Sequence, residues 1–156
     1  MNVLAPTAER VPLHTAQDIN QRIRRQTEQN IAHYSSADAQ TIDRRLKELD
    51  QEWDIERTLE ANAATAALVG LGLGAMVDRR FFALPAAVAG FLLQHAIQGW
   101  CPPLPVFRRL GFRTQTEIEM ERYALKAIRG DFEQISKTAV QKNDGSSHDI
   151  LESMRK

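Results

Sequence analysis

Two uncharged, apolar stretches, separated by a short charged turn, constrain the fold of this chain more than any other feature. They are Ala61–Val77, with 17 residues, and Phe81–Trp100, with 20. As α-helices they would be about 25 and 30 Å long, close to the roughly 30 Å of a bilayer's hydrocarbon core. The sequence therefore predicts a transmembrane helical hairpin over residues 61–100.

The distribution of charge supports this interpretation. The chain has 20 basic and 20 acidic residues, yet residues 61–100 contain only Asp78, Arg79 and Arg80. The alternative is a soluble four-helix bundle with residues 61–100 as its core helices. Because both stretches lack the polar face that such helices usually keep, we favour the membrane. The balanced net charge gives no indication of nucleic-acid binding.

Small residues recur at helical spacing in both stretches. In lipid, such residues allow two helix backbones to approach closely. Two interpretations stay open: the small residues pack the hairpin against itself, or they form a contact between copies in a homo-oligomer, such as a dimer. The residues concerned are Ala63, Ala67, Gly70 and Gly74 in the first stretch, and Ala86 and Gly90 in the second.

Basic residues near the ends of the hairpin predict its orientation. Two of them, Arg79 and Arg80, lie in the turn, whereas seven lie within about 20 residues of the outer ends. This asymmetry places both termini in the cytoplasm and the turn outside. Trp100 and Trp53 fit the aromatic belt at the membrane surface. The seven basic residues are Arg44, Arg45, Lys47, Arg57, Arg108, Arg109 and Arg113.

The segments outside the hairpin predict an all-α protein with amphipathic cytoplasmic helices. We expect a flexible N-terminus over residues 1–14 and a helical arm over 15–60. In that arm a weaker helix, about 16–34, precedes a helix capped by Ser35 or Ser36, which runs through 37–60 into the first span. Its apolar seam consists of Ile42, Leu46, Leu49 and Trp53.

A second cytoplasmic helix is predicted over residues 115–142, followed by a flexible tail over 143–156. The motif from Thr116 to Glu119 has the form of a capping box. The apolar seam of this helix is similar in length to that of the arm. The two seams therefore pack on each other or on a second copy of the chain. The second seam consists of Leu125, Ile128, Phe132, Ile135 and Ala139.

Cys101 is the only cysteine, which excludes an internal disulfide and a multi-cysteine metal site. It begins a predicted interfacial segment, 101–114, that lies along the lipid headgroups with Arg108 and Arg109 as anchors. One interpretation is an inert small residue that ends the helix at Pro102. The other is a reactive thiol, because nearby arginines favour the thiolate. His95 is an ionisable residue near the membrane surface, where we expect interfacial hydrogen bonding.

Two short motifs resemble the transmembrane domain of the bacterial inner-membrane rhodanese family. They are Gly99-Trp100-Cys101-Pro102 and Leu110-Gly111-Phe112-Arg113-Thr114, and the resemblance covers about residues 55–115. It implies a two-helix hairpin in the bacterial inner membrane and dimerisation. The chain departs from the family pattern in its prolines at 102, 103 and 105, and it contains no rhodanese domain.

The function predicted from these features is that of a non-enzymatic scaffold or anchor in the lipid bilayer. It would self-associate and present its cytoplasmic helices to a protein partner. The alternative is a thiol relay in sulfur trafficking, in which Cys101 works with a separate sulfurtransferase. The sequence contains no recognisable set of catalytic residues, metal-ligand spacing or cofactor motif, so neither a metal nor a cofactor is expected.

Overall fold

The computed structural model describes residue 6 and residues 8–132, and this part of the chain is built from helices without a strand. The prediction of an all-α protein is confirmed for it. The elements are α1 (Arg10–Leu13), α2 (Gln17–Tyr34), α3 (Ala39–Gln51), α4 (Ile55–Met76), the 3₁₀ helix η1 (Arg79–Phe82), α5 (Ala83–Gln98), α6 (Leu104–Leu110) and α7 (Gln115–Arg129).

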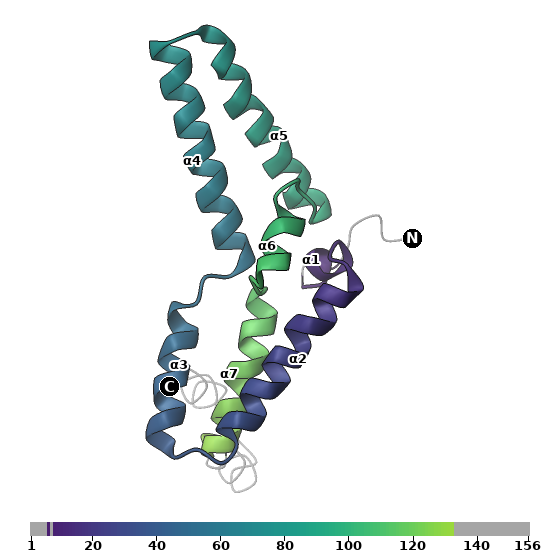
Figure 1. Cartoon of the computed structure of the whole chain (residues 1–156), viewed down its shortest axis with the longest axis vertical. Coiled ribbons are helices and arrows are strands. Elements are labelled where there is room, and N and C mark those ends of the chain that lie inside the picture. The colour runs from purple at the N-terminus through teal and green to yellow at the C-terminus, as the bar shows by residue number, and fades with distance from the viewer. Residues whose placement is uncertain (1–5, 7, 133–156) are drawn as a thin grey trace, which may run out of the picture.

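The molecule is elongated, with α4 and α5 projecting from one end (Figure 1). These two helices pack against each other and are joined by η1. The opposite end is a three-helix body in which α7 contacts both α2 and α3. The short helices α1 and α6 lie where the pair and the body meet (Figure 1). We refer to α4, η1 and α5 as the hairpin, and to α2, α3 and α7 as the body.

The body has its own apolar core. The α3 side chains predicted as a seam pack against Ile118 and Leu125 of α7, within one copy of the chain. Trp53, the last residue of the predicted seam, does not belong to this core. It follows the end of α3, and 46% of its surface is exposed. The seam residues that remain are Ile42, Leu46 and Leu49.

The predicted continuous helix over 37–60 is wrong, because the chain breaks between α3 and α4. Asp54 caps α4 by accepting a 2.8 Å hydrogen bond from the backbone N–H of Arg57. Asp38, rather than Ser35 or Ser36, caps α3 by accepting one from Thr41 at the same distance. An aspartate in extended backbone satisfies N–H groups that a helix start leaves unpaired, so each of the two aspartates begins a new helix.

The bounds of α7 also differ from the prediction. Its capping box joins Thr114 to Glu117, two residues earlier than the predicted Thr116 and Glu119. The helix ends at Arg129 because Gly130 adopts a left-handed conformation with φ of 89°. The predicted helix over 115–142 is therefore too long, and residues 133–142 and the predicted tail 143–156 lie outside the described residues.

Part of the predicted flexible N-terminus is helical. The segment α1 places Val11 in an apolar cluster with only 3% of its surface exposed. The polar side chain of Asn20 fixes the segment by donating a 2.9 Å hydrogen bond to the carbonyl of Pro12. Residues 8–14 are thus held by burial and by a link to α2, which the prediction for 1–14 did not include.

Two glycines of the first stretch, Gly70 and Gly74, face α5 and η1. A Cβ added at Gly70 would lie 2.6 Å from Pro85, and one added at Gly74 would lie 2.7 Å from the ring of Phe82. Of the two interpretations of the small residues, the contact within the hairpin therefore accounts for this pair. Ala63 and Ala67 are half-buried, whereas Ala86 and Gly90 are exposed.

This packing predicts opposite effects for two neighbouring glycine substitutions. Alanine favours a helix over glycine by about 1 kcal/mol, and nothing lies within 4 Å of an added Cβ at Gly72. Gly72→Ala should leave the melting temperature in detergent unchanged or raise it. Gly74→Ala should lower it, because the added methyl group displaces Phe82 at a cost of about 1–3 kcal/mol. Equal melting temperatures for the two variants would contradict this packing of the hairpin.

Candidate functional site

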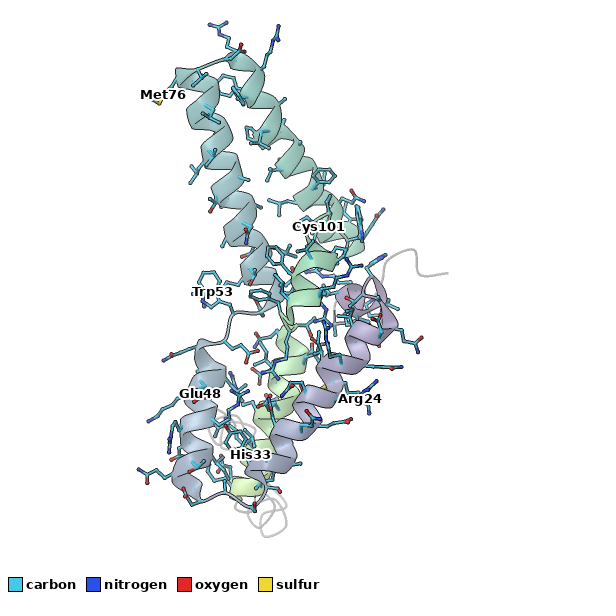
Figure 2. The ribbon with its side chains drawn as sticks, viewed as in Figure 1. Arg24, His33, Glu48, Trp53, Met76 and Cys101 are labelled. Carbon is cyan, nitrogen blue, oxygen red and sulfur yellow. The ribbon has the colours of Figure 1, made fainter. Side chains whose placement is uncertain are left out.

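The most unusual cluster of side chains lies where the hairpin meets the body. Figure 2 shows Cys101 at this junction, between α5 and α6. Gly99 makes the junction possible, because it ends α5 in a left-handed conformation with φ of 79°. A Cβ at Gly99 would lie 2.6 Å from the Cβ of Arg10 and 2.7 Å from its carbonyl oxygen. Glycine at this position therefore allows α1 to close over the end of α5.

Cys101 is buried, with 5% of its surface exposed. Its neighbours in the apolar cluster come from α1, α4 and α6, and the partly buried rings of Trp100, Phe107 and Phe112 pack against the same cluster. The turn that contains Cys101 reaches the surface at the next two residues, Pro102 and Pro103, which are exposed. The thiol thus lies just beneath the surface, among Val11, Ile55, Leu59 and Leu104.

The side chain of His95 links α5 to α4. Its Nε2 lies 2.7 Å from Oε2 of Glu56, and the other oxygen of that carboxylate accepts a 2.9 Å bond from Arg10. Nδ1 of His95 is buried and has no hydrogen-bond partner among the described residues. Arg10, Glu56 and His95 therefore form a hydrogen-bonded series that joins α1, α4 and α5.

The surroundings of Glu56 favour the ionised form of its carboxyl group. The hydrogen bond with His95 lowers the pKa of this carboxyl group most, and the charge and hydrogen bond of Arg10 lower it further, against the opposing effect of burial. The carboxylate therefore remains ionised. In this state it orients the imidazole and stabilises a proton on it.

The arginines predicted to influence the thiol or to anchor the segment at the headgroups do not share one role. Arg108 is fully buried and donates to both carboxylate oxygens of Glu117, at 2.7 and 2.8 Å. Arg113 is also buried and binds Glu52 and Glu121. Only Arg109 is exposed. The prediction of Arg108 as a headgroup anchor is therefore wrong, because its guanidinium is buried and bound by Glu117. The position of residues 101–114 at the headgroups, with the exposed Arg109 as an anchor, stays a prediction.

The two tryptophans occupy different environments. Trp100 is half-buried and packs against the apolar cluster around Cys101. Trp53 lies in the connection between α3 and α4, labelled in Figure 2, and the guanidinium of Arg57 lies 4.3 Å from its ring centroid. This separation is typical of a cation–π contact. Both tryptophans lie near the end of the hairpin that adjoins the body.

Sequence reasoning identified His95 and Cys101 separately but missed Glu56 altogether. Glu56 is one of many acidic residues that precede the first apolar stretch, and 39 positions separate it from His95. Only the pairing of α4 with α5 brings them together. Within the described residues, no group of three His, Cys, Asp or Glu side chains is arranged to hold a metal ion.

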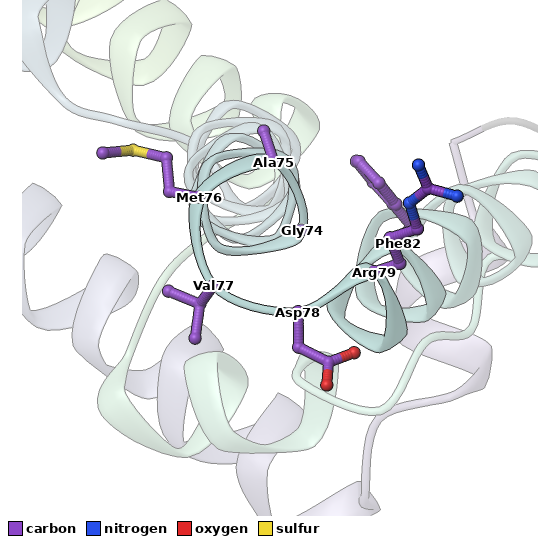
Figure 3. A pocket seen from close by; sticks show the side chains of 7 residues that line it. All are labelled: Gly74, Ala75, Met76, Val77, Asp78, Arg79 and Phe82. Atoms are coloured by element: carbon purple, nitrogen blue, oxygen red, sulfur yellow. The ribbon is translucent and has the colours of Figure 1, made fainter.

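A hollow lies at the far end of the hairpin. It encloses about 360 Å³ and is open to the outside. Figure 3 shows that the residues around it come from the end of α4, from the connection that follows it and from η1. Apart from Asp78 and Arg79 they are apolar, and no set of catalytic groups converges there. The lining residues are Gly74, Ala75, Met76, Val77, Asp78, Arg79 and Phe82.

Comparison of the chain with models of known protein families, with curated proteins and with solved structures finds no match. The resemblance to the inner-membrane rhodanese family thus rests on its two sequence motifs. The structure gives one of them a physical role, since Gly99 and Cys101 form the junction between α5, α1 and α6.

Proposed function

We propose that this chain is a non-enzymatic anchor of the bacterial inner membrane. In this proposal residues 61–77 and 81–100 cross the bilayer, the turn between them lies outside, and the body stands in the cytoplasm as a scaffold for a partner protein. The observation that carries the proposal is the apolar outer surface of the hairpin.

Large apolar side chains on the hairpin point away from the protein. The exposed fraction reaches 87% at Met76, which projects from the far end in Figure 2, and 69% at Leu68 and Val77. Two helical stretches, the second being Arg79–Gln98, are long and apolar enough to cross a membrane, and little of either is buried within the protein. The core helices of a soluble bundle would be covered, so this exposure favours lipid as the surrounding medium.

The body has the opposite character. Its buried arginines are matched by carboxylates, and the outer face of α2 carries exposed charged residues such as Arg24 and Glu28. Such a surface is stable in water and unsuited to hydrocarbon. The exposed basic residues nearest the hairpin, including Arg57 and Arg109, support a cytoplasmic body.

Self-association is a further part of the proposal. Since Gly70 and Gly74 pack within the hairpin, a second copy would have to use another face. The outer face of α5 offers one, because Ala86 is exposed and nothing lies within 4 Å of a Cβ added at Gly90. Small residues on a lipid-facing helix permit the close approach that a dimer requires.

Cysteine labelling in intact cells tests the anchor. In a Cys101→Ser background, Arg79→Cys should react with a membrane-impermeant maleimide added from outside. Ser36→Cys, in the connection between α2 and α3, should react only after the cells are opened. Both positions are exposed in the structure, so burial does not explain a difference. Labelling of Ser36→Cys from outside, or of neither position, would overturn the proposed orientation.

The alternative function is a thiol relay in sulfur trafficking that uses Cys101. Two of the arginines predicted to activate the thiol, Arg108 and Arg113, are bound by carboxylates instead. A relay would require a separate sulfurtransferase as its sulfur donor. Its test is the mass of the protein purified from its native membrane, where an added sulfur atom on Cys101 would support it.

A further inference from the structure

We propose that Arg22 and Arg109 bind the headgroups of anionic phospholipids in the leaflet that faces the body. The inference rests on the proposed membrane function, and it goes further by naming the class of lipid and the two residues that select it. Three observations carry it: the contact between these two residues, the lack of a carboxylate partner for either, and the apolar face beside them.

The fold brings the two arginines together from separate helices. Nη2 of Arg22, on α2, donates a 2.7 Å hydrogen bond to the backbone carbonyl of Arg109, on α6. The buried Arg108 holds α6 in this position by donating to Asn20 of α2 at 2.9 Å. Both Arg22 and Arg109 are exposed. Two cationic residues therefore lie side by side on the surface, near the start of α2 and the end of α6.

Neither Arg22 nor Arg109 has a carboxylate partner in the part of the chain that the structure describes. Two cations close together repel each other, and an anion bound between them removes that repulsion. A phosphate group suits this place, because a guanidinium group can donate two parallel N–H bonds to phosphate oxygens. The arginines that pack between helices differ, since each binds Asp or Glu; they are Arg10, Arg45, Arg108, Arg113, Arg122 and Arg129.

The apolar face beside the two arginines favours a lipid over a soluble phosphate. α6 buries Leu104 and Arg108 on one side, and its opposite side exposes Val106, Arg109 and Leu110. The exposed fractions are 54% at Val106 and 69% at Leu110. A helix that presents apolar side chains together with a cation is suited to the boundary between headgroups and acyl chains.

The level of the two arginines along the molecule agrees with a place at the headgroups. α6 and the start of α2 lie where the hairpin meets the body (Figure 1). α6 also follows the second span along the chain, after the exposed apolar side chains of Leu93 and Ile97. With residues 81–100 across the bilayer, Arg22 and Arg109 lie near its cytoplasmic surface. Anionic lipids there increase the affinity about fivefold for each nearby arginine.

Native mass spectrometry of the full chain tests the site. The protein is released from neutral detergent micelles that contain equal amounts of phosphatidylglycerol, which is anionic, and phosphatidylcholine, which is zwitterionic. We expect the parent to retain more phosphatidylglycerol. The double variant Arg22→Gln and Arg109→Gln should lower the ratio of the two bound lipids about 25-fold, since each arginine contributes about fivefold. Arg44→Gln with Lys47→Gln, an equal change of charge at exposed positions of α3, should leave the ratio unchanged.

Two further measurements separate the lipid from a soluble anion and the headgroup site from the anchor. Inorganic phosphate should displace no more phosphatidylglycerol than sodium chloride of equal ionic strength, because the acyl chains make contacts that a free ion lacks. Displacement specific to phosphate, equal ratios for the two double variants, or no preference for phosphatidylglycerol in the parent would each overturn the headgroup site. Retention of the protein in carbonate-washed membranes would then show that the anchor stands without it, whereas release would overturn both.

Discussion

Arg108→Ala is expected to unfold the junction between the hairpin and the body, whereas Arg109→Ala should have almost no effect. The Arg108 guanidinium is fully buried and donates five hydrogen bonds. Removing it leaves Glu117 without its cation. Breaking a buried ion pair from one side costs about 3–5 kcal/mol.

Loss of Arg108 should also destabilise the neighbouring helices α2 and α7, because its guanidinium binds residues in both. It donates to Asn20 of α2 at 2.9 Å, to the carbonyl of Phe112 at 2.9 Å and to Glu117 of α7. Glu117 also accepts the N–H of Thr114 in the capping box of α7. Loss of the arginine therefore weakens the start of α7 together with the attachment of α6 to α2.

Thermal unfolding in detergent, followed by circular dichroism, measures this difference. For Arg108→Ala we expect the melting temperature to fall by roughly 6–20 °C, taking about 2–4 °C per kcal/mol for a chain of this size. Arg108→Lys should lie between alanine and the parent, because one ammonium group cannot reproduce the planar fork of bonds. Similar melting temperatures for Arg108→Ala and Arg109→Ala would contradict the burial of Arg108.

Glu121→Gln is expected to produce a comparable loss, centred on the body. Glu121 is fully buried and binds two arginines, Arg113 at 2.5 Å and Arg45 at 2.8 Å. Asn30 of α2 donates to it as well. Glutamine keeps the size of the side chain but removes the charge, so the buried Arg113 and the partly buried Arg45 lose the counterion that they share. We expect a cost of about 3–5 kcal/mol in the free energy of unfolding.

A matched control is available on the same network. Glu48 also pairs with Arg45, at 3.1 Å, but more than half of its side chain is exposed. Glu48→Gln should therefore change the free energy of unfolding by about 0–1 kcal/mol. The same denaturation experiment compares the two variants. If Glu48→Gln destabilised the protein as much as Glu121→Gln, burial would not be the decisive factor in this network.

Low pH should destabilise the protein by protonating the carboxylates of Glu121 and Glu117. Burial by itself raises the pKa of Glu121, but hydrogen bonds from Arg45, Arg113 and Asn30 outweigh it, and the pKa is lowered from its ordinary value of 4.5. The pKa of Glu117 is lowered in the same way, by the hydrogen bonds and charge of Arg108. The stabilisation is therefore complete above this ordinary value and is lost as the pH falls through the lowered pKa. The melting temperature of Glu121→Gln should accordingly vary less with pH in this acidic range than that of the parent.

The sequence by itself determined the features that depend on local composition. The two apolar stretches are long and apolar enough to cross a membrane, and the charged triplet lies at the turn between α4 and α5. Helix starts were predicted less well. Asp38 and Asp54 are ordinary acidic residues in a charged segment, and nothing in their immediate neighbourhood distinguishes them from Ser35 as a cap. The break at Trp53 also depends on Arg113, which binds Glu52 from 61 positions away.

The tertiary structure alone decided which face each residue presents. Gly70 packs against Pro85, Arg108 is bound by Glu117 rather than by headgroups, and His95 is bound by Glu56. The composition of a stretch does not specify its rotation about the helix axis. That rotation is set by the fit of side chains across α4 and α5 and by the need to pair each buried charge, and both depend on residues far apart in the sequence.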